Sequence, residues 1–119
     1  MYEVETADTE AAASRYFEAW TSGDTGVVIS LLAEDFKFSG GDMSIEGREA
    51  FLSAGAFPRD ARVTMVAQAY QGPTGFQMYD AERGQNRVRI VEQLTVRDGL
   101  IRTSVFVADM AAFMALMGH

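Results

Sequence analysis

Residues 87–97 alternate between apolar and polar side chains, and this pattern limits the possible folds more than any other in the sequence. Successive side chains of a strand point to opposite faces, so the pattern predicts a strand with one buried face. Asp98-Gly99 follows directly and is a strong signal for a two-residue hairpin, with residues 100–108 as the returning strand. We therefore expect a largely antiparallel sheet that packs one face against a core.

The remaining chain divides into a helical part and a strand part. Residues 62–70 and 75–82 have strand spacing and are separated by Gly72-Pro73. Before them, helices are predicted at residues 9–20, 25–33 and 48–54, and short strands at residues 36–38 and 43–45. Asp109 can cap a last short helix. We expect residues 1–119 to form one α+β domain, because this length suits a single core.

The composition restricts the available chemistry. The chain has no cysteine, which excludes disulfides, a thiolate nucleophile and cysteine-ligated metal sites. Its only histidine is His119, the last residue, which argues against a Ser-His-Asp arrangement and a histidine-rich metal site. Acid and base chemistry must then come from carboxylates, tyrosine or arginine. We expect neither a metal nor an organic cofactor.

The charge distribution argues against nucleic acid and membranes as partners. The net charge is −7, and the basic residues are scattered between Arg15 and Arg102 with Lys37 as the single lysine, whereas nucleic-acid binding needs a basic face. No apolar run approaches the roughly 20 residues of a membrane span. Residues 1–10 are acidic where a signal peptide would be basic and then apolar. The simplest expectation is a cytoplasmic protein.

Glu92 gives the sharpest chemical signal. It shares strand parity with the apolar residues Val88, Ile90, Leu94 and Val96, so it is the one carboxyl group on the predicted buried face. Desolvation there would raise its pKa, and a neutral carboxylic acid can donate a hydrogen bond to a developing oxyanion. The alternative is that Glu92 lies near a sheet edge or pairs with an arginine from another element.

Several short motifs, in this order and spacing, resemble the NTF2-like superfamily and within it the SnoaL-like domains. They are Arg15-Tyr16-Phe17 followed by Gly23-Asp24, Leu31-Leu32-Ala33-Glu34-Asp35-Phe36, Ile45-Glu46-Gly47-Arg48-Glu49-Ala50, and Val96-Arg97-Asp98-Gly99-Leu100-Ile101. The resemblance covers nearly the whole chain. It implies a cone in which a bent sheet wraps around about three helices, usually dimeric through the sheet. Because fold does not fix function, it leaves isomerases, cyclases, epoxide hydrolases, dehydratases and non-catalytic modules open.

By position, the catalytic template that the chain is most similar to is ketosteroid isomerase. Tyr16 aligns with that family's oxyanion-binding tyrosine, and Glu92 falls where the family has its protonated aspartic acid. The family's general-base aspartate aligns with Gly40 here. Asp42 lies two residues further and would keep the same face of a continued strand, so we consider it as a displaced base.

Two other templates of the superfamily fit less well. Its epoxide hydrolases use an Asp-Arg-Asp set to activate water, but Arg89 and Glu92 have opposite parity and are expected on opposite faces. Its SnoaL-like cyclases use carboxylate chemistry on polyketide-like substrates. Asp80 is a further strand carboxyl group, and it fits either a site residue or the solvated end of a hairpin.

On this resemblance we expect an interior pocket for a small, largely apolar molecule with an oxygen function bound by Tyr16 and Glu92. The expected lining residues are Trp20, Phe38, Ile90 and Phe113. Core packing is the alternative for Tyr16 and Trp20. The stripe Met110, Phe113, Met114 and Met117 fits core or dimer surface better than a ligand lid.

Two functions of different class remain. The first is carboxylate-mediated proton transfer next to a carbonyl, such as isomerisation or cyclisation, with Tyr16, Glu92 and Asp42 as catalytic residues. The second is a non-catalytic ligand-binding or dimerisation module, which Gly40 at the aligned base position favours. Both predict a homodimer through the sheet.

Overall fold

The computed structural model describes residues 2–54 and 57–118. Its helices are α1 (Tyr2–Ser22), α2 (Thr25–Leu31), α3 (Arg48–Ser53) and α4 (Met110–Met117). Its strands are β1 (Leu32–Gly40), β2 (Met43–Glu46), β3 (Arg62–Gln71), β4 (Thr74–Arg83), β5 (Asn86–Arg97) and β6 (Leu100–Val107). The helical first part and the strand-rich second part agree with the expectation from the sequence.

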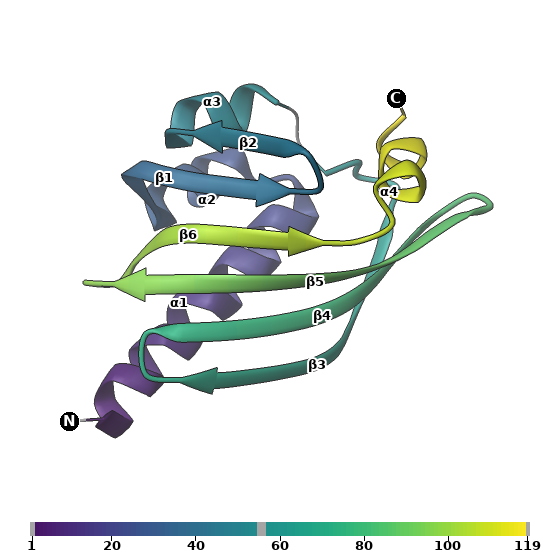
Figure 1. The fold of residues 1–119 in the computed structure, drawn as a ribbon. Coiled ribbons are helices and arrows are strands. Elements are labelled where there is room, and N and C mark those ends of the chain that lie inside the picture. The colour runs from purple at the N-terminus through teal and green to yellow at the C-terminus, as the bar shows by residue number, and fades with distance from the viewer. Residues whose placement is uncertain (1, 55–56, 119) are drawn as a thin grey trace.

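The six strands form one curved sheet in the order β2-β1-β6-β5-β4-β3 (Figure 1). All neighbours are antiparallel except β1 and β6, which are parallel. Helix α1 crosses one face of the sheet and contacts β3, β4, β5 and β6, while α3 packs on β1 and β2, and α4 contacts β5 (Figure 1). The face under these helices is called the inner face below, and the opposite one the outer face.

Strand alternation decides which side chains reach the inner face. In β5, the buried residues are Val88, Ile90, Glu92, Leu94 and Val96, as their parity predicts. In β4, the buried set is Gly75, Gln77, Tyr79 and Ala81. The two strands face each other in regular register, so Gln77 lies directly opposite Glu92. The core therefore contains a polar patch at the middle of β5.

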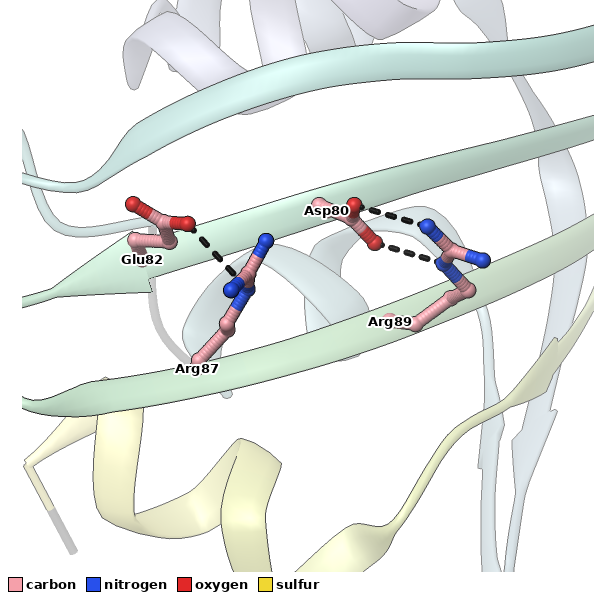
Figure 2. Close-up of polar contacts among 4 residues, drawn as sticks. All are labelled: Asp80, Glu82, Arg87 and Arg89. Carbon is pink, nitrogen blue, oxygen red and sulfur yellow. Dashed lines mark hydrogen bonds and ion pairs between the residues drawn. The ribbon is translucent and has the colours of Figure 1, made fainter.

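The outer face of β4 and β5 carries two cross-strand ion pairs (Figure 2). Arg89 donates to both carboxylate oxygens of Asp80 at 2.7 and 2.9 Å, and Arg87 lies 3.1 Å from Glu82. Arg89 and Glu92 thus lie on opposite faces, as expected from parity. Asp80 is partnered on the outer face, away from the core.

Two helix caps and the hairpin turn form at the residues predicted from the sequence. The side chains of Asp24 and Asp109 accept hydrogen bonds from the backbone N–H of Val27 and Ala112, which caps α2 and α4. Asp98 and Gly99 adopt φ of 56° and 76°, the left-handed conformation of a two-residue hairpin turn. No helix in the described ranges has the length and apolar character needed to span a membrane.

Three predicted boundaries were wrong. Helix α1 begins at Tyr2 instead of residue 9, so it is two turns longer than its apolar stripe. Helix α2 ends at Leu31, because Leu32 is already extended with φ −95° and ψ 140°. The strand predicted at residues 36–38 runs over Leu32–Gly40, since it has partners on both sides, antiparallel β2 and parallel β6.

Candidate functional site

Glu92 lies at the middle of β5, fully covered by the core. Its residue is 1% exposed, between the buried side chains of Ile90 and Leu94 on the same face. Its strand neighbours are Gln77 on β4 and Phe106 on β6. Neither the edge position nor the arginine partner considered as alternatives applies, because β5 is an inner strand and no ion pair among residues 2–54 and 57–118 includes Glu92.

Three hydroxyl groups from three elements meet at the Glu92 carboxyl group. The Tyr79 hydroxyl donates a hydrogen bond to Oε1. The Ser104 hydroxyl donates to Oε2 at 2.8 Å, and the Tyr16 hydroxyl lies 3.4 Å from the same oxygen. These four residues, Tyr16, Tyr79, Glu92 and Ser104, are called the Glu92 cluster below. The cluster satisfies a buried acid without a countercharge.

Burial raises the pKa values of Glu92 and of the two tyrosines in the cluster. Desolvation raises the pKa of the Glu92 carboxyl above its usual range, and the hydrogen bonds from Tyr79, Ser104 and Tyr16 offset only part of this rise. Desolvation likewise raises the pKa of Tyr16 and Tyr79, and the charge of Glu92 adds to the rise in both. Burial thus disfavours ionisation of Glu92 and of both tyrosines.

Trp20 lies against the cluster. Its ring stacks on that of Tyr16, with centroids 6.4 Å apart and an interplanar angle of 4°. Its indole N–H donates to the Tyr79 hydroxyl at 3.3 Å. Trp20 also packs on Phe51 and Phe57, with centroid distances of 5.3 and 5.6 Å. The indole is thus in contact with Phe51 and Phe57 as well as with the cluster.

A small apolar pocket of about 70 Å³ lies beside Trp20, between α1, α3, α4 and the β1–β2 hairpin. It is lined by Trp20, Phe38, Met43, Ile45, Phe51, Ala54, Phe113, Met114 and Met117. Three of the four residues predicted to line a pocket, Trp20, Phe38 and Phe113, are in this set. Ile90 is not, and is fully buried within the core.

Asp42 and Gly40 lie apart from the cluster. Asp42 is exposed in the turn between β1 and β2, and it is neither a hydrogen-bond partner of Glu92 nor a lining residue of the apolar pocket. Gly40 is buried beside Phe106, where an added Cβ would lie 3.2 Å from the Phe106 Cβ. The structure thus brings Tyr16 and Glu92 together but does not bring Asp42 to them.

A wider groove of about 810 Å³ lies elsewhere, between α1 and the β5–β6 hairpin. Its charged lining residues are Glu5, Asp8, Arg15, Arg97 and Asp98. None of the Glu92 cluster lines it. Its charges are mixed, and in the described part of the chain none of its lining side chains has a buried polar atom without a partner.

Tyr79 and Ser104 were missed as partners of Glu92. Tyr79 could have been found, because the alternation of β4 places it with Gln77 and Ala81 on the buried face, opposite the face of Asp80. Ser104 is harder to find. A register shift between Thr95 and Val96 changes the parity of β6 relative to β5, and no sequence pattern marks it.

The family follows from the sequence pattern of the chain. The pattern of the SnoaL-like domain matches residues 13–103, well over half of the chain. This chain belongs to the SnoaL-like domain family. The resemblance inferred from the short motifs is thereby confirmed. None of the curated proteins matches this SnoaL-like domain.

Solved structures support the same fold for the SnoaL-like domain. A protein from Kribbella flavida assigned as a ketosteroid isomerase has a TM-score of 0.82 and 26% identity, over 87% of this chain and 79% of that chain. A protein from Jannaschia sp. assigned as a SnoaL-like polyketide cyclase has a TM-score of 0.81 and 18% identity, over 95% and 93%. An NTF2-like protein of unknown function from Mesorhizobium loti has a TM-score of 0.78 and 19% identity, over 88% and 93%. The expected α+β, NTF2-like fold class is confirmed.

The SnoaL-like domain thus holds two adjoining features, an apolar pocket and a buried acid. No cluster of three or more histidine, cysteine, aspartate or glutamate side chains suited to a metal occurs in the part of the chain that the structure describes. A protonated Glu92 can donate a hydrogen bond, and the tyrosine hydroxyls can do the same. The pocket can hold only a few carbon atoms unless its methionine side chains shift.

Proposed function

We propose that this SnoaL-like domain binds a small, apolar molecule in the pocket beside Trp20. The observation that carries the proposal is the lining of that pocket. Trp20 is the one lining residue with an N–H or O–H group in its side chain, and the others are aliphatic, aromatic or thioether side chains. Small-molecule sites are concave and lined mainly by apolar side chains, and they usually enclose roughly 300–1,000 Å³, so the ligand here must be small or the walls must move.

The size and the walls of the pocket support a ligand of few heavy atoms. Its volume of about 70 Å³ is below the roughly 150 Å³ of an apolar cavity that takes benzene. Met114 and Met117 of α4 and Met43 of β2 line it with unbranched, flexible side chains, which adapt to ligands of different shape. We expect it to accept molecules of about the size of benzene once these side chains shift.

Trp20 fluorescence tests this proposal, because it is the only tryptophan of the chain. Titration with toluene should change the emission saturably. The variant Ile45→Phe, which adds volume to a lining position, should weaken toluene binding at least about tenfold, while Val105→Phe on the exposed outer face should not. Equal binding by all three proteins would overturn the pocket as the ligand site. Native mass spectrometry of the purified protein would detect any co-purified ligand.

A second candidate function is proton transfer next to the carbonyl of a small apolar compound. The buried Glu92 cluster favours it, because the raised pKa of Glu92 and the two tyrosine hydroxyls supply proton donors that can stabilise an enolate oxygen once they turn from one another to the ligand. In this function Tyr16 and Glu92 bind the oxygen and Asp42 is the base, which requires the β1–β2 turn to approach the cluster.

Hydrogen exchange at the α-carbon tests this second function directly. Proton NMR of cyclopentanone in D₂O should show faster loss of α-protons with the protein than without it. Tyr16→Phe should then reduce the rate about 10²–10³-fold, as for other oxyanion donors, and Asp42→Asn should abolish the acceleration. No acceleration by the wild-type protein would remove proton transfer and leave ligand binding in place.

We also propose that two copies associate through the outer face of the sheet. Phe76, Val105 and Val107 are 45, 40 and 60% exposed on the outer face, on β4 and β6. Exposed apolar side chains gathered on one sheet face support association. Native mass spectrometry should show a dimer, and Val107→Lys should give a monomer with unchanged toluene binding.

A further inference from the structure

Trp20 belongs both to the pocket and to the surroundings of Glu92. Among the nine lining residues, and within the ranges that the structure describes, it is the one with a hydrogen bond or ring contact to a member of the Glu92 cluster. Tyr16, Tyr79, Glu92 and Ser104 do not line the pocket. The indole is therefore one wall between an apolar space and a polar one, together with Phe106, which pairs with Glu92 and packs on Phe38 and Phe113.

The orientation of the indole decides what the pocket offers to a ligand. Its N–H is directed to the Tyr79 hydroxyl, 3.3 Å away, so the one side-chain donor among the lining residues is used on the cluster side. The remaining lining side chains have no N–H or O–H group. A ligand carbonyl in the pocket would lose its hydrogen bonds to water and find no side-chain donor in exchange, which is unfavourable.

The position of the wall is fixed by its neighbours. Phe51 packs on the indole with a centroid distance of 5.3 Å, Phe57 meets it edge to face at 5.6 Å, and Tyr16 stacks on it. Trp20 is 7% exposed. Rotating the indole away from Tyr79 would disturb all three ring contacts as well as the hydrogen bond, so the closed arrangement is the stable one.

We propose that Trp20 determines the ligand specificity of this domain by closing the apolar pocket off from Glu92, so that the pocket takes a hydrocarbon group and rejects an isostere that carries a carbonyl. The inference rests on the proposed pocket being the ligand site, and it is the alternative to the second candidate function, in which a carbonyl oxygen reaches Glu92. It adds the ligand chemistry, a hydrocarbon group, and the residue that selects it, Trp20. It also assigns the Glu92 cluster to the far side of the selecting wall.

Two probes of equal size test the inference, methylenecyclopentane and cyclopentanone, which differ in a CH₂ group against an oxygen. Their dissociation constants, measured by NMR shift titration, give a preference ratio for each protein. Wild type should prefer the hydrocarbon at least about tenfold, because the carbonyl stays without a donor. Trp20→Ala should shift the ratio about tenfold or more toward the ketone, since the pocket then reaches the Glu92 cluster.

Phe113→Ala is the matched control. It also removes an aromatic wall of the pocket, but Phe113 contacts Phe106 with a centroid distance of 4.8 Å and has no contact with Tyr79 among the described rings. It should enlarge the pocket and keep the hydrocarbon preference. A ratio that shifts equally in Trp20→Ala and Phe113→Ala, or in neither, would overturn the role of Trp20 and leave the pocket as a ligand site.

Wild type alone supplies a second readout in case Trp20→Ala does not fold. The single indole N–H gives one NMR signal, which should stay protected from exchange when methylenecyclopentane fills the pocket, because its bond to Tyr79 persists. Loss of that protection would contradict the closed wall, and a wild-type preference for cyclopentanone would do the same. Binding of neither probe to any of the three proteins would remove the proposed pocket, and the inference with it.

Discussion

The Tyr79 hydroxyl joins the Glu92 carboxyl group to the Trp20 indole: it donates to Glu92 Oε1 and accepts from the indole N–H. Tyr79 lies on β4 and Glu92 on the adjacent β5, two residues apart in register, with both side chains on the inner face. The polar core of the domain is thus connected to the wall of its pocket through one hydroxyl group.

Removing that hydroxyl should destabilise the domain. Tyr79→Phe leaves Glu92 Oε1 and the indole N–H without a partner, both of them buried, and should lower the free energy of unfolding by about 1–3 kcal/mol. Tyr16→Phe is the matched control, because its hydroxyl lies 3.4 Å from Glu92 Oε2, which Ser104 also serves. It should cost about 1 kcal/mol or less. Urea unfolding of both variants measures the difference, and a larger loss for Tyr16→Phe would contradict the geometry.

Glu92 should give stability a distinct dependence on pH. Its pKa is raised in the folded state, so the folded protein binds the proton more tightly than the unfolded chain, whose value is near 4.3. The contribution of Glu92 is fully present below pH 4.3 and is lost as pH rises through the folded pKa. Glu92→Gln should remove this falling component, seen as the difference between the two urea-unfolding profiles. The exposed Glu10→Gln is the control, and parallel profiles for wild type and Glu92→Gln would show Glu92 to be solvated.

The stability that Asp80 contributes should depend on pH in the opposite direction. Its hydrogen bond with Arg89 holds the pKa of its carboxyl below its usual value, so the stability that it contributes is present above the unfolded value near 3.9 and is lost as pH falls through the folded pKa. Asp80→Asn should therefore lower stability at neutral pH and make no difference in strong acid. Because the pair lies on the outer face, added salt should reduce the effect. An effect that grows on acidification would contradict this assignment.

Substitution of Gly40 by any larger residue should destabilise the domain. An added Cβ would meet the Cβ and the backbone oxygen of Phe106 at 3.2 and 3.3 Å, and neither atom is at the flexible end of a side chain. Gly40→Ala should thus lower the melting temperature, with a cost of about 1–3 kcal/mol from overpacking. Gly26→Ala in α2 is the control, since its Cβ would have ordinary contacts and gain helix propensity. A neutral Gly40→Ala would mean that this position has room for a side chain.

Much of the fold could be predicted from the sequence because its signals are local. Alternation in residues 87–97 gave the buried face of β5 correctly, including Glu92, and the Asp98-Gly99 turn gave the hairpin. The ends of α2 and β1 could not be predicted in this way. Leu32 becomes extended because β6, about 70 residues later, pairs with it in parallel, and single-residue propensities do not contain that contact.

The candidate site was predictable only in part, for a similar reason. Parity and helix spacing brought Tyr16 and Glu92 to one core, and their hydroxyl-to-carboxyl contact is present. The closure of the pocket by Trp20 depends on ring contacts with Phe51 and Phe57, which come from separate segments. The contribution of Asp42 to any chemistry stays a prediction, with its side chain exposed in the β1–β2 turn.

A crystal structure of the wild-type protein soaked with methylenecyclopentane would show whether Trp20 separates the ligand from Glu92. We expect density for the probe enclosed by Trp20, Phe113 and Met114, with the indole N–H still on Tyr79 and no probe atom touching Glu92. An empty pocket with the probe elsewhere would contradict the ligand site. A probe in contact with Glu92, with the indole displaced, would contradict the wall that Trp20 forms.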